Sequence, residues 1–325
     1  MLIFGVRKGV LPRRRIDMEV SVIIPVYNKF DYLETCLRSV LDQEMDDFEV
    51  VVVDDGSMDG SGEVCDRLAA EYARLRVIHV ANGGVTRARR IAFNASSGRY
   101  VTFVDADDRM LPGGLKTLYE SIERVGSDEV IATYVDNSGR LCDSGMRGFV
   151  DPDVLIRQLC GSKAHFCILW AVIFRREILE GCLDEARVVI RPGQDILMQL
   201  MCLAGRPRVF FIEDSVYCYN AGITAYKTPR VEAQEAFDEM LRRAFAGRWS
   251  ELKGSYTLRQ VKAYETLLTF NLFDDARRYL STFKADIDGG VPRADRIVCH
   301  LPPRLALLLI RCWRRIIPLL PGSGC

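Results

Sequence analysis

The chain of 325 residues is long enough for one large domain or for one domain with an added lobe. Hydrophobic residues make up 49% of it, which is typical of a globular protein with a full core, and 44 basic residues balance 44 acidic ones. The zero net charge excludes an overall basic field, so we predict no nucleic-acid partner. The 11 cysteines lack metal-type spacing, which predicts buried, reduced thiols in a cytoplasmic protein.

Both ends of the chain are basic. Residues 1–17 carry five basic residues and one Asp, residues 291–325 carry six Arg and one Asp, and the body between them is acidic. This pattern favours contact with an anionic membrane surface. No secretory signal is evident, and the longest apolar run, at 166–174, is too short to span a bilayer. Because Met18 directly precedes the first strand, we interpret residues 1–17 as a basic tail, either disordered or upstream of the true start.

Strands and helices alternate in the first part of the chain. Hydrophobic β-branched runs predict strands, and apolar residues three and four positions apart predict helices. The predicted strands are 20–26, 48–53, 75–80, 100–104 and 130–135. The predicted helices are 31–41, 63–72, 85–95 and 115–125. This alternation indicates parallel β-α-β units, so we expect an α/β fold with helices on both faces of the sheet.

The pattern is less regular after residue 135. The predicted elements are a loop at 136–148, a short helix at 154–160, a buried strand at 166–174, a helix at 196–203, a strand at 208–212, and helices at 233–245, 258–270 and 276–283. We therefore expect one α/β domain over 18–225, with halves at 19–135 and 136–225, and a helical region over 226–325.

The last apolar segment, residues 301–317, also contains Arg residues and Trp313. Such a segment can lie in a bilayer interface with its Arg side chains among the headgroups. It can equally be a terminal helix that packs on the protein body with its Arg residues solvated. The sequence leaves both interpretations open.

Two acidic clusters follow hydrophobic strands about fifty residues apart. The first ends the run Val50–Ser57 and the second ends the run Tyr100–Asp108. Parallel strands of an open α/β sheet place their carboxyl ends at one edge, where such proteins bind ligands. Two groups of carboxylates at that edge repel each other unless they hold something positive. A divalent cation, or hydrogen-bond donors from a nucleotide, would meet that need.

Three segments together resemble a known family. They are Val20–Asn28, Val53–Ser61 and Phe103–Asp108. In order, spacing and flanking strands they are similar to the family 2 glycosyltransferases of the GT-A fold. The resemblance covers about residues 19–135. It implies a Rossmann-like nucleotide-diphospho-sugar transferase fold, with a mixed, mostly parallel sheet, helices on both faces and a helical C-terminal region.

The resemblance implies a nucleoside pocket at the end of the first strand. Pro25, Val26 and Tyr27 would line it, and Asp55 would offer a carboxylate to the base. Asp54 would support the loop. The residue types of this segment also suit a capped turn before a helix, and both interpretations can hold together.

The second acidic cluster would hold the diphosphate end of the donor. By resemblance, Asp105 lies near the ribose and Asp107 binds Mn²⁺ or Mg²⁺, while Asp108 belongs to the turn. A divalent cation offsets the negative charge that grows on the leaving diphosphate. Because phosphate and water supply most of its ligands, few protein ligands are needed. The alternative is an acidic turn without a ligand.

A glycine-rich turn, Asn82–Gly84, precedes the third predicted helix. By resemblance, Arg89 faces the nucleotide pocket. This chain departs from the family at Arg90, where Asn is usual, and at Ala92, where Gly is usual. The alternative is that the basic residues here form a solvated helix face.

Inverting transfer needs a base that takes the proton of the acceptor hydroxyl, which typically accelerates a reaction by about 10²–10⁴-fold. The family supplies it as the Asp of a Glu-Asp pair, which implies Asp195, although Gln194 replaces the Glu. The alternative for Asp195 is a helix N-cap, and Asp214 is the second candidate base. Trp170 fits either sugar stacking or, more often, a core. His79, His165 and His300 form no cluster and receive no role.

Taken together, the resemblance implies an inverting, metal-dependent glycosyltransferase of the hexosyltransferase type. It would move a sugar from a nucleotide-diphosphate sugar, most often a UDP-sugar, to a hydroxyl on a glycan or lipid-linked acceptor. The basic C-terminus suggests a bacterial surface polysaccharide precursor as acceptor, and a protein either free in the cytoplasm or peripheral on the inner face of the membrane.

Two other classes of protein are alternatives. A sugar-phosphate nucleotidyltransferase would need a Gly-rich basic loop where this chain has Pro25–Asn28. A non-catalytic, membrane-associated scaffold with the same fold remains open because of Gln194 and Arg90.

Overall fold

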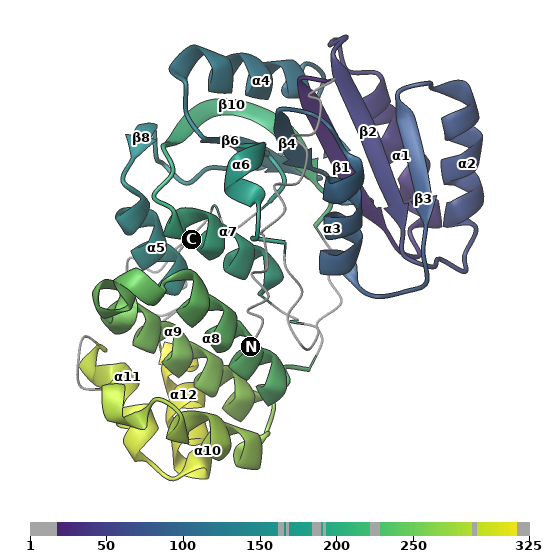
Figure 1. Cartoon of the computed structure of the whole chain (residues 1–325). Helices are drawn as coiled ribbons and strands as arrows, with labels where there is room; N and C mark the ends of the chain where they lie inside the picture. Colours follow the sequence, from purple (N-terminus) through teal and green to yellow (C-terminus); the bar gives the residue numbers. More distant parts are fainter. Residues whose placement is uncertain are drawn as a thin grey trace, which may run out of the picture.

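A computed structural model gives the fold of most of the chain (Figure 1). It describes residues 18–161, 166, 169–183, 190, 193–221, 228–287 and 291–316. The tail expected at 1–17 lies outside the described residues.

Ten strands and twelve α-helices make up the described part. The strands are β1 (Val20–Val26), β2 (Phe48–Asp54), β3 (Leu75–His79), β4 (Tyr100–Phe103), β5 (Arg109–Met110), β6 (Glu129–Asp136), β7 (Leu141–Cys142), β8 (Gly148–Val150), β9 (Val172–Arg175) and β10 (Val209–Tyr219). The helices are α1 (Phe30–Leu41), α2 (Ser61–Glu71), α3 (Val85–Ala95), α4 (Gly114–Val125), α5 (Pro152–Cys160), α6 (Arg176–Leu179), α7 (Gln194–Ala204), α8 (Val231–Ala244), α9 (Trp249–Thr269), α10 (Phe273–Ser281), α11 (Arg293–His300) and α12 (Pro303–Ile316), with 3-10 turns at Ala246–Arg248 and Lys284–Asp286.

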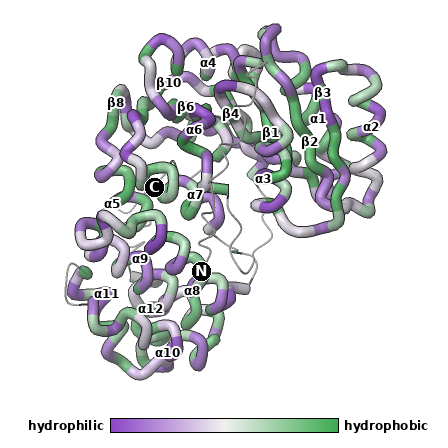
Figure 2. Tube along the Cα trace, viewed as in Figure 1, coloured by the Kyte–Doolittle hydropathy of each residue, from purple (hydrophilic) through white to green (hydrophobic). Residues whose placement is uncertain are grey.

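The strands form one mixed sheet in the order β3-β2-β1-β4-β9-β6-β10-β5, with β7 beside β6 and β8 beside β10. β3, β2, β1 and β4 are parallel neighbours, and β10 is parallel to β6. β9 lies antiparallel between β4 and β6. The continuous apolar strands β1 and β2 are buried on both faces, because helices cover both sides of the sheet (Figures 1 and 2). The mixed, mostly parallel sheet with helices on both faces is therefore confirmed.

Three predicted elements around the site differ from the structure, and the helix predicted at 258–270 begins earlier, at Trp249. β9 begins at Val172, because Ala171 has a φ of 56° and breaks the extended conformation. β10 continues to Tyr219 and includes the polar stretch at 213–215, where its register with β6 shifts. The predicted loop at 136–148 contains β7 and the start of β8.

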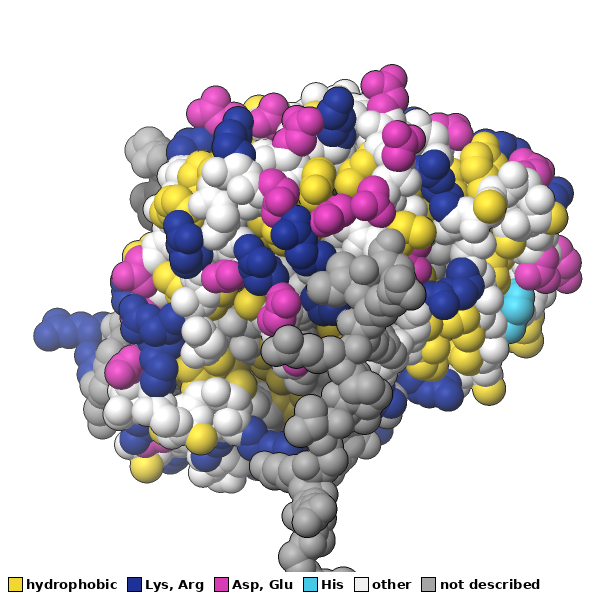
Figure 3. Space-filling view, turned by 45° about the horizontal axis from the view of Figure 1, so that its top comes forward, with side chains coloured by type: hydrophobic (Ala, Val, Ile, Leu, Met, Phe, Trp, Pro, Cys, Tyr) yellow, Lys and Arg dark blue, Asp and Glu magenta, His cyan; other side chains and the backbone are white. Residues whose placement is uncertain are grey.

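The helical region has a second core. The first half of α9 and much of α8 pack into the core of the sheet domain through residues such as Phe237 and Tyr256. The second half of α9 packs with α10, α11 and α12 in a separate cluster that includes Val261 and Tyr279. In the described part of the chain, no helix is long and apolar enough to cross a membrane. Charged side chains of both signs are spread over the face shown in Figure 3.

Candidate active site

The carboxyl ends of β1, β2 and β4 lie side by side. Val26 of β1 pairs with Asp54 of β2, and the N–H of Val104, just beyond β4, donates to Ile23 of β1 at 3.0 Å. Both acidic clusters therefore leave the sheet at the same edge, as the sequence predicts.

The end of β1 and the first residue after it are the three residues expected around a nucleoside. Pro25 is partly buried, the side chain of Val26 is in the core, and the ring of Tyr27 is 43% exposed. Val26 can therefore reach a ligand only through its backbone, whose carbonyl accepts the N–H of Asp55 at 2.8 Å. Asn28 follows with a φ of 52°, and its Oδ1 accepts the N–H of Met58 at 2.9 Å. This contact fixes the connection against the turn after β2.

Asp54 and Asp55 both organise neighbouring backbone. Asp54 accepts the N–H of Ser57 at 3.0 Å and contacts His79 Nδ1 at 2.9 Å. Although burial opposes it, the hydrogen bonds of Ser57 and His79 lower the pKa of Asp54. His79 also meets Asp66, and these two carboxylates raise its pKa. The role of His79 was not predicted, because its partners lie 25 and 13 residues away.

Asp55 is buried and holds the glycine-rich turn that opens α3. Its Oδ1 accepts the N–H of Gly83 at 2.8 Å, and its Oδ2 accepts the N–H of Gly84 at 2.7 Å. Asn82 Nδ2 donates to the Asp55 carbonyl at 3.0 Å. The position of Asp55 therefore sets where α3 starts, and α3 carries Arg89.

Arg89 is the centre of the site. Its guanidinium is buried, donates to Asp105 Oδ1 at 3.0 Å and to Asp195 Oδ1 at 2.8 Å, and lies 5.8 Å from the Phe103 ring centroid. Although burial opposes the charge, Asp195 and Asp105 raise the pKa of Arg89, so it stays protonated. Burial also raises the pKa of Asp105, against the effect of Arg89. The Arg89 side chain thus joins Asp105 and Asp195, which the sequence singled out separately.

Asp195 lies in the first turn of α7 and is not its cap. The helix begins at Gln194, and Gly193, with a φ of 110°, is the cap residue. The side chain of Asp195 is 35% exposed, so it is reachable from solvent. Asp214, the second candidate base, is an exposed residue within β10. Arg191 and Pro192, which precede Gly193, lie outside the described residues.

The other two carboxylates of the turn after β4 have their own partners. Asp107 forms an ion pair with Lys29. Asp108 is buried, accepts from Tyr217 Oη at 2.8 Å and from the Asn220 N–H at 2.8 Å. Burial raises the pKa of Asp108 to about 7. Tyr217 and Asn220 were not predicted as partners of Asp108. Because of the polar residues at 213–215, the strand was predicted to end at 212, before both of them.

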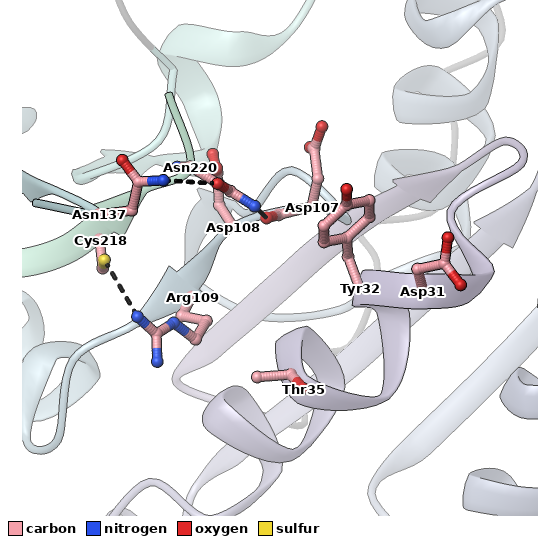
Figure 4. Close-up of a pocket in the computed structure, with 9 residues that line it drawn as sticks. All are labelled: Asp31, Tyr32, Thr35, Asp107, Asp108, Arg109, Asn137, Cys218 and Asn220. Atoms are coloured by element: carbon pink, nitrogen blue, oxygen red, sulfur yellow. Dashed lines mark hydrogen bonds between the residues drawn. The ribbon is translucent and has the colours of Figure 1, made fainter. Parts of the chain in front are cut away.

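A cavity of about 160 Å³ opens beside this turn (Figure 4). It is lined by Asp31, Tyr32, Thr35, Asp107, Asp108, Arg109, Asn137, Cys218 and Asn220. The first three come from α1, and the hydrogen bonds from Asn137 to Asn220 and from Arg109 to Cys218 lie on the opposite side. Trp170, in contrast, is buried and stacks on Tyr217 with ring centroids 4.7 Å apart, which supports its interpretation as core.

The protein offers few ligands for a divalent cation, so a bound nucleotide would have to complete such a site. In the part of the chain that the structure describes, no group of three or more His, Cys, Asp or Glu side chains is arranged to hold a metal. Asp107, however, offers a partly exposed carboxylate that already contacts a cationic group. Hard oxygen donors of this kind suit Mg²⁺ or Mn²⁺ when phosphate and water supply the other ligands.

Comparison with known proteins places the chain in a family. The profile of glycosyl transferase family 2 matches residues 21–183. The chain is 30% identical over 241 residues to the uncharacterized glycosyltransferase EpsJ of Bacillus subtilis (strain 168), covering 70% of this chain and 67% of EpsJ. It is 31% identical over 206 residues to the poly(ribitol-phosphate) beta-glucosyltransferase of Bacillus spizizenii, covering 62% of this chain and 32% of that protein.

Solved structures share the fold. S. aureus TarS residues 1–349, in complex with UDP-GlcNAc, superposes with a TM-score of 0.72 at 21% identity and covers 92% of both chains. The mannosyltransferase PcManGT from Pyrobaculum calidifontis, in complex with GDP-Man and Mn²⁺, gives a TM-score of 0.53 at 18% identity over 94% of this chain and 82% of that one. The architecture and the site edge define a GT-A glycosyltransferase fold. The chain belongs to glycosyl transferase family 2.

Proposed function

We propose that this chain is an inverting glycosyltransferase that transfers a sugar from a nucleotide-diphosphate sugar, expected to be a UDP-sugar, to a hydroxyl acceptor. The observation that carries the proposal is Arg89, which binds the donor-side carboxylate of Asp105 and the proposed base Asp195 at once. Donor and acceptor must meet between these two groups for direct displacement.

On the donor side, the exposed ring of Tyr27 is the surface on which the base would lie. Asp55 already accepts two backbone hydrogen bonds, and its remaining lone pairs would accept from the base. Asp105 would hold the ribose. Asp107 would hold Mn²⁺ or Mg²⁺, which would offset the charge that develops on the departing diphosphate. The UDP-GlcNAc bound to TarS and the GDP-Man and Mn²⁺ bound to PcManGT support a donor and cation of these classes.

On the acceptor side, Asp195 would take the proton of the attacking hydroxyl. Arg89 contacts its Oδ1, so Oδ2 is the oxygen we assign to the proton. The buried guanidinium fixes the carboxylate geometry while leaving 35% of the Asp195 side chain exposed. The acceptor oxygen then attacks the anomeric carbon from the side opposite the diphosphate, and the configuration inverts. The name of the B. spizizenii relative, a poly(ribitol-phosphate) beta-glucosyltransferase, supports a polymer as the acceptor class. For this chain we propose a glycan or a lipid-linked sugar.

We further propose peripheral contact with the inner face of the membrane through α12. Ala306, Leu307 and Ile310 of this helix are buried against the helical region. Leu305 and Leu308 point outward and are 52% and 56% exposed. Exposed Arg304 and Arg311 flank them, and no acidic residue lies on α12. An apolar strip bordered by arginines is suited to an anionic bilayer surface. This arrangement lets α12 combine both interpretations that the sequence left open.

Calorimetric titration of UDP and of GDP, with and without Mn²⁺, tests the donor site. We expect UDP to bind wild type with Mn²⁺, and the Mn²⁺-dependent part of the affinity to vanish in Asp107→Ala. Asp214→Ala is the matched control and should bind as wild type. Absence of binding to either nucleotide under every metal condition would contradict the proposal and favour a non-catalytic scaffold.

A further inference from the structure

The turn after β4 brings three carboxylates close together, and each has a separate partner. Asp105 is held by Arg89, and Asp108 by Tyr217 and Asn220. Asp107 is held by Lys29. Since neighbouring carboxylates repel one another, each partner lowers the cost of keeping the cluster charged. Arg89 and Tyr217 are buried, whereas Asn220 and Lys29 are only partly buried.

The backbone of Lys29 is fixed by hydrogen bonds, whereas its side chain contacts only Asp107 among the described residues. It follows Asn28, which has a positive φ, and its own N–H donates to Ser61 Oγ at 2.9 Å. The next N–H, of Phe30, donates to Asp59 Oδ2 at 3.0 Å. The side chains of Lys29 and Asp107 are 27% and 20% exposed, so their contact lies at the open edge of the site. The ammonium group can therefore leave Asp107 without any change in the backbone.

We infer that Lys29 is an exchangeable counter-ion: it holds Asp107 when donor is absent and moves to the donor diphosphate when a divalent cation takes Asp107. The inference rests on the cation site of the proposed function. Lys29 contacts Asp107 through Oδ2, so a cation that binds this oxygen must displace the ammonium. A lysine suits this exchange, because its charge sits at the end of a flexible four-carbon chain and needs no fixed bonding geometry.

The exchange couples the cation to the nucleotide. A cation that arrives alone must displace Lys29 and leave it without a partner. A cation that arrives with a nucleoside diphosphate offers Lys29 phosphate oxygens in return. Each ligand should therefore tighten the binding of the other, by the same factor in both directions. The free enzyme then keeps a neutral pair at Asp107 and binds little cation until donor arrives.

The test measures Mn²⁺ binding to the full chain by electron paramagnetic resonance of the free ion, with and without UDP. In Lys29→Met, we expect Mn²⁺ alone to bind about three- to tenfold more tightly than in wild type, because the competing charge is gone. We expect UDP to bind the Mn²⁺-loaded variant about tenfold more weakly, because an ammonium–phosphate contact is lost. Lys29→Arg retains the charge and should behave like wild type for Mn²⁺ alone.

Lys253→Met is the matched control, because it breaks a lysine–carboxylate pair of similar type, with Asp286, in the helical region. It should leave Mn²⁺ binding unchanged. If folded Lys29→Met binds Mn²⁺ alone as tightly as wild type or more weakly, the inference is overturned. If that variant still binds Mn²⁺ in the presence of UDP, the proposed function stands even so. If wild type binds no Mn²⁺ even with UDP, the proposed cation role fails and the exchange fails with it.

Discussion

Glu129 links the sheet to the helix that carries Asp195, and its burial allows a quantitative prediction of how stability depends on pH. It lies in β6 with no exposed surface, and its Oε1 accepts from Gln199 of α7 at 3.0 Å. Its Oε2 is buried and has no hydrogen-bond partner in the described part of the chain. Burial raises the pKa of Glu129 to about 7, from an ordinary value of 4.5. We therefore predict that Glu129→Gln stabilises the protein at alkaline pH.

The sign follows from proton binding. Between pH 4.5 and about 7 the folded chain holds a proton on Glu129 that the unfolded chain has released, so the stability falls as pH rises through this window. Above it the loss levels off at about 3 kcal/mol. Gln keeps the oxygen that accepts from Gln199 and cannot ionise. Glu129→Gln should thus gain about 3 kcal/mol at pH 8.5 and about 1 kcal/mol or less at pH 5.

Thermal unfolding at a series of pH values measures the effect. For a protein of this size a gain of about 3 kcal/mol corresponds to a rise in Tm of about 4–5 °C. Glu120→Gln is the control, because Glu120 on α4 is 63% exposed and pairs only with Lys116 at 3.9 Å in the described residues. A Tm gain for Glu129→Gln that does not grow with pH, or a loss at pH 8.5, would refute the argument from burial.

The remaining predictions concern catalysis and membrane contact. Asp195→Asn should lower kcat by about 10²–10⁴-fold with nucleotide binding unchanged, while Asp214→Asn stays near wild type; the reverse pattern in a glycosyl-transfer assay would reassign the base. Arg89→Lys should lower kcat by about tenfold or more, because one ammonium cannot reproduce a fork that binds two carboxylates; unchanged kcat would contradict a positioning role. Replacing Arg304 and Arg311 together by Ser should weaken binding to anionic vesicles, measured by sedimentation, by about tenfold or more and leave binding to neutral vesicles unchanged. Equal binding of wild type and the double variant to anionic vesicles would remove α12 from the membrane contact.

Local patterns predicted much of the fold of residues 19–135. The hydrophobic runs of β1 and β2 are long and buried on both faces, and α3 matches its predicted bounds at 85–95 because apolar residues mark its inner face. The placement of both acidic clusters at one edge followed from parallel strands alone. β9 could not be foreseen as an antiparallel insertion between β4 and β6, since strand order depends on contacts far apart in the sequence.

The same limit applies to the site. The residues Asp105, Asp107 and Asp195 could be named from their motifs, yet the sequence held no sign of how they are joined. Arg89 meets Asp195 across 106 positions, and Lys29 meets Asp107 across 78. Polar residues at the middle of β10 hid the stretch that holds Asp108, because alternation of apolar residues is the signal by which strands are predicted.

The contact between Arg89 and Asp195 also sets a rule for building hybrid enzymes within the family. Arg89, Asp55 and Lys29 all come from the first 110 residues, whereas Asp195 comes from the half that precedes the helical region. A segment from a relative that replaced residues 136–225 would bring its own version of the proposed acceptor side to an unchanged proposed donor side. Such a hybrid would keep its geometry only if the incoming segment placed a carboxylate within reach of Arg89. A buried guanidinium left with a single partner would otherwise destabilise the junction between the two halves.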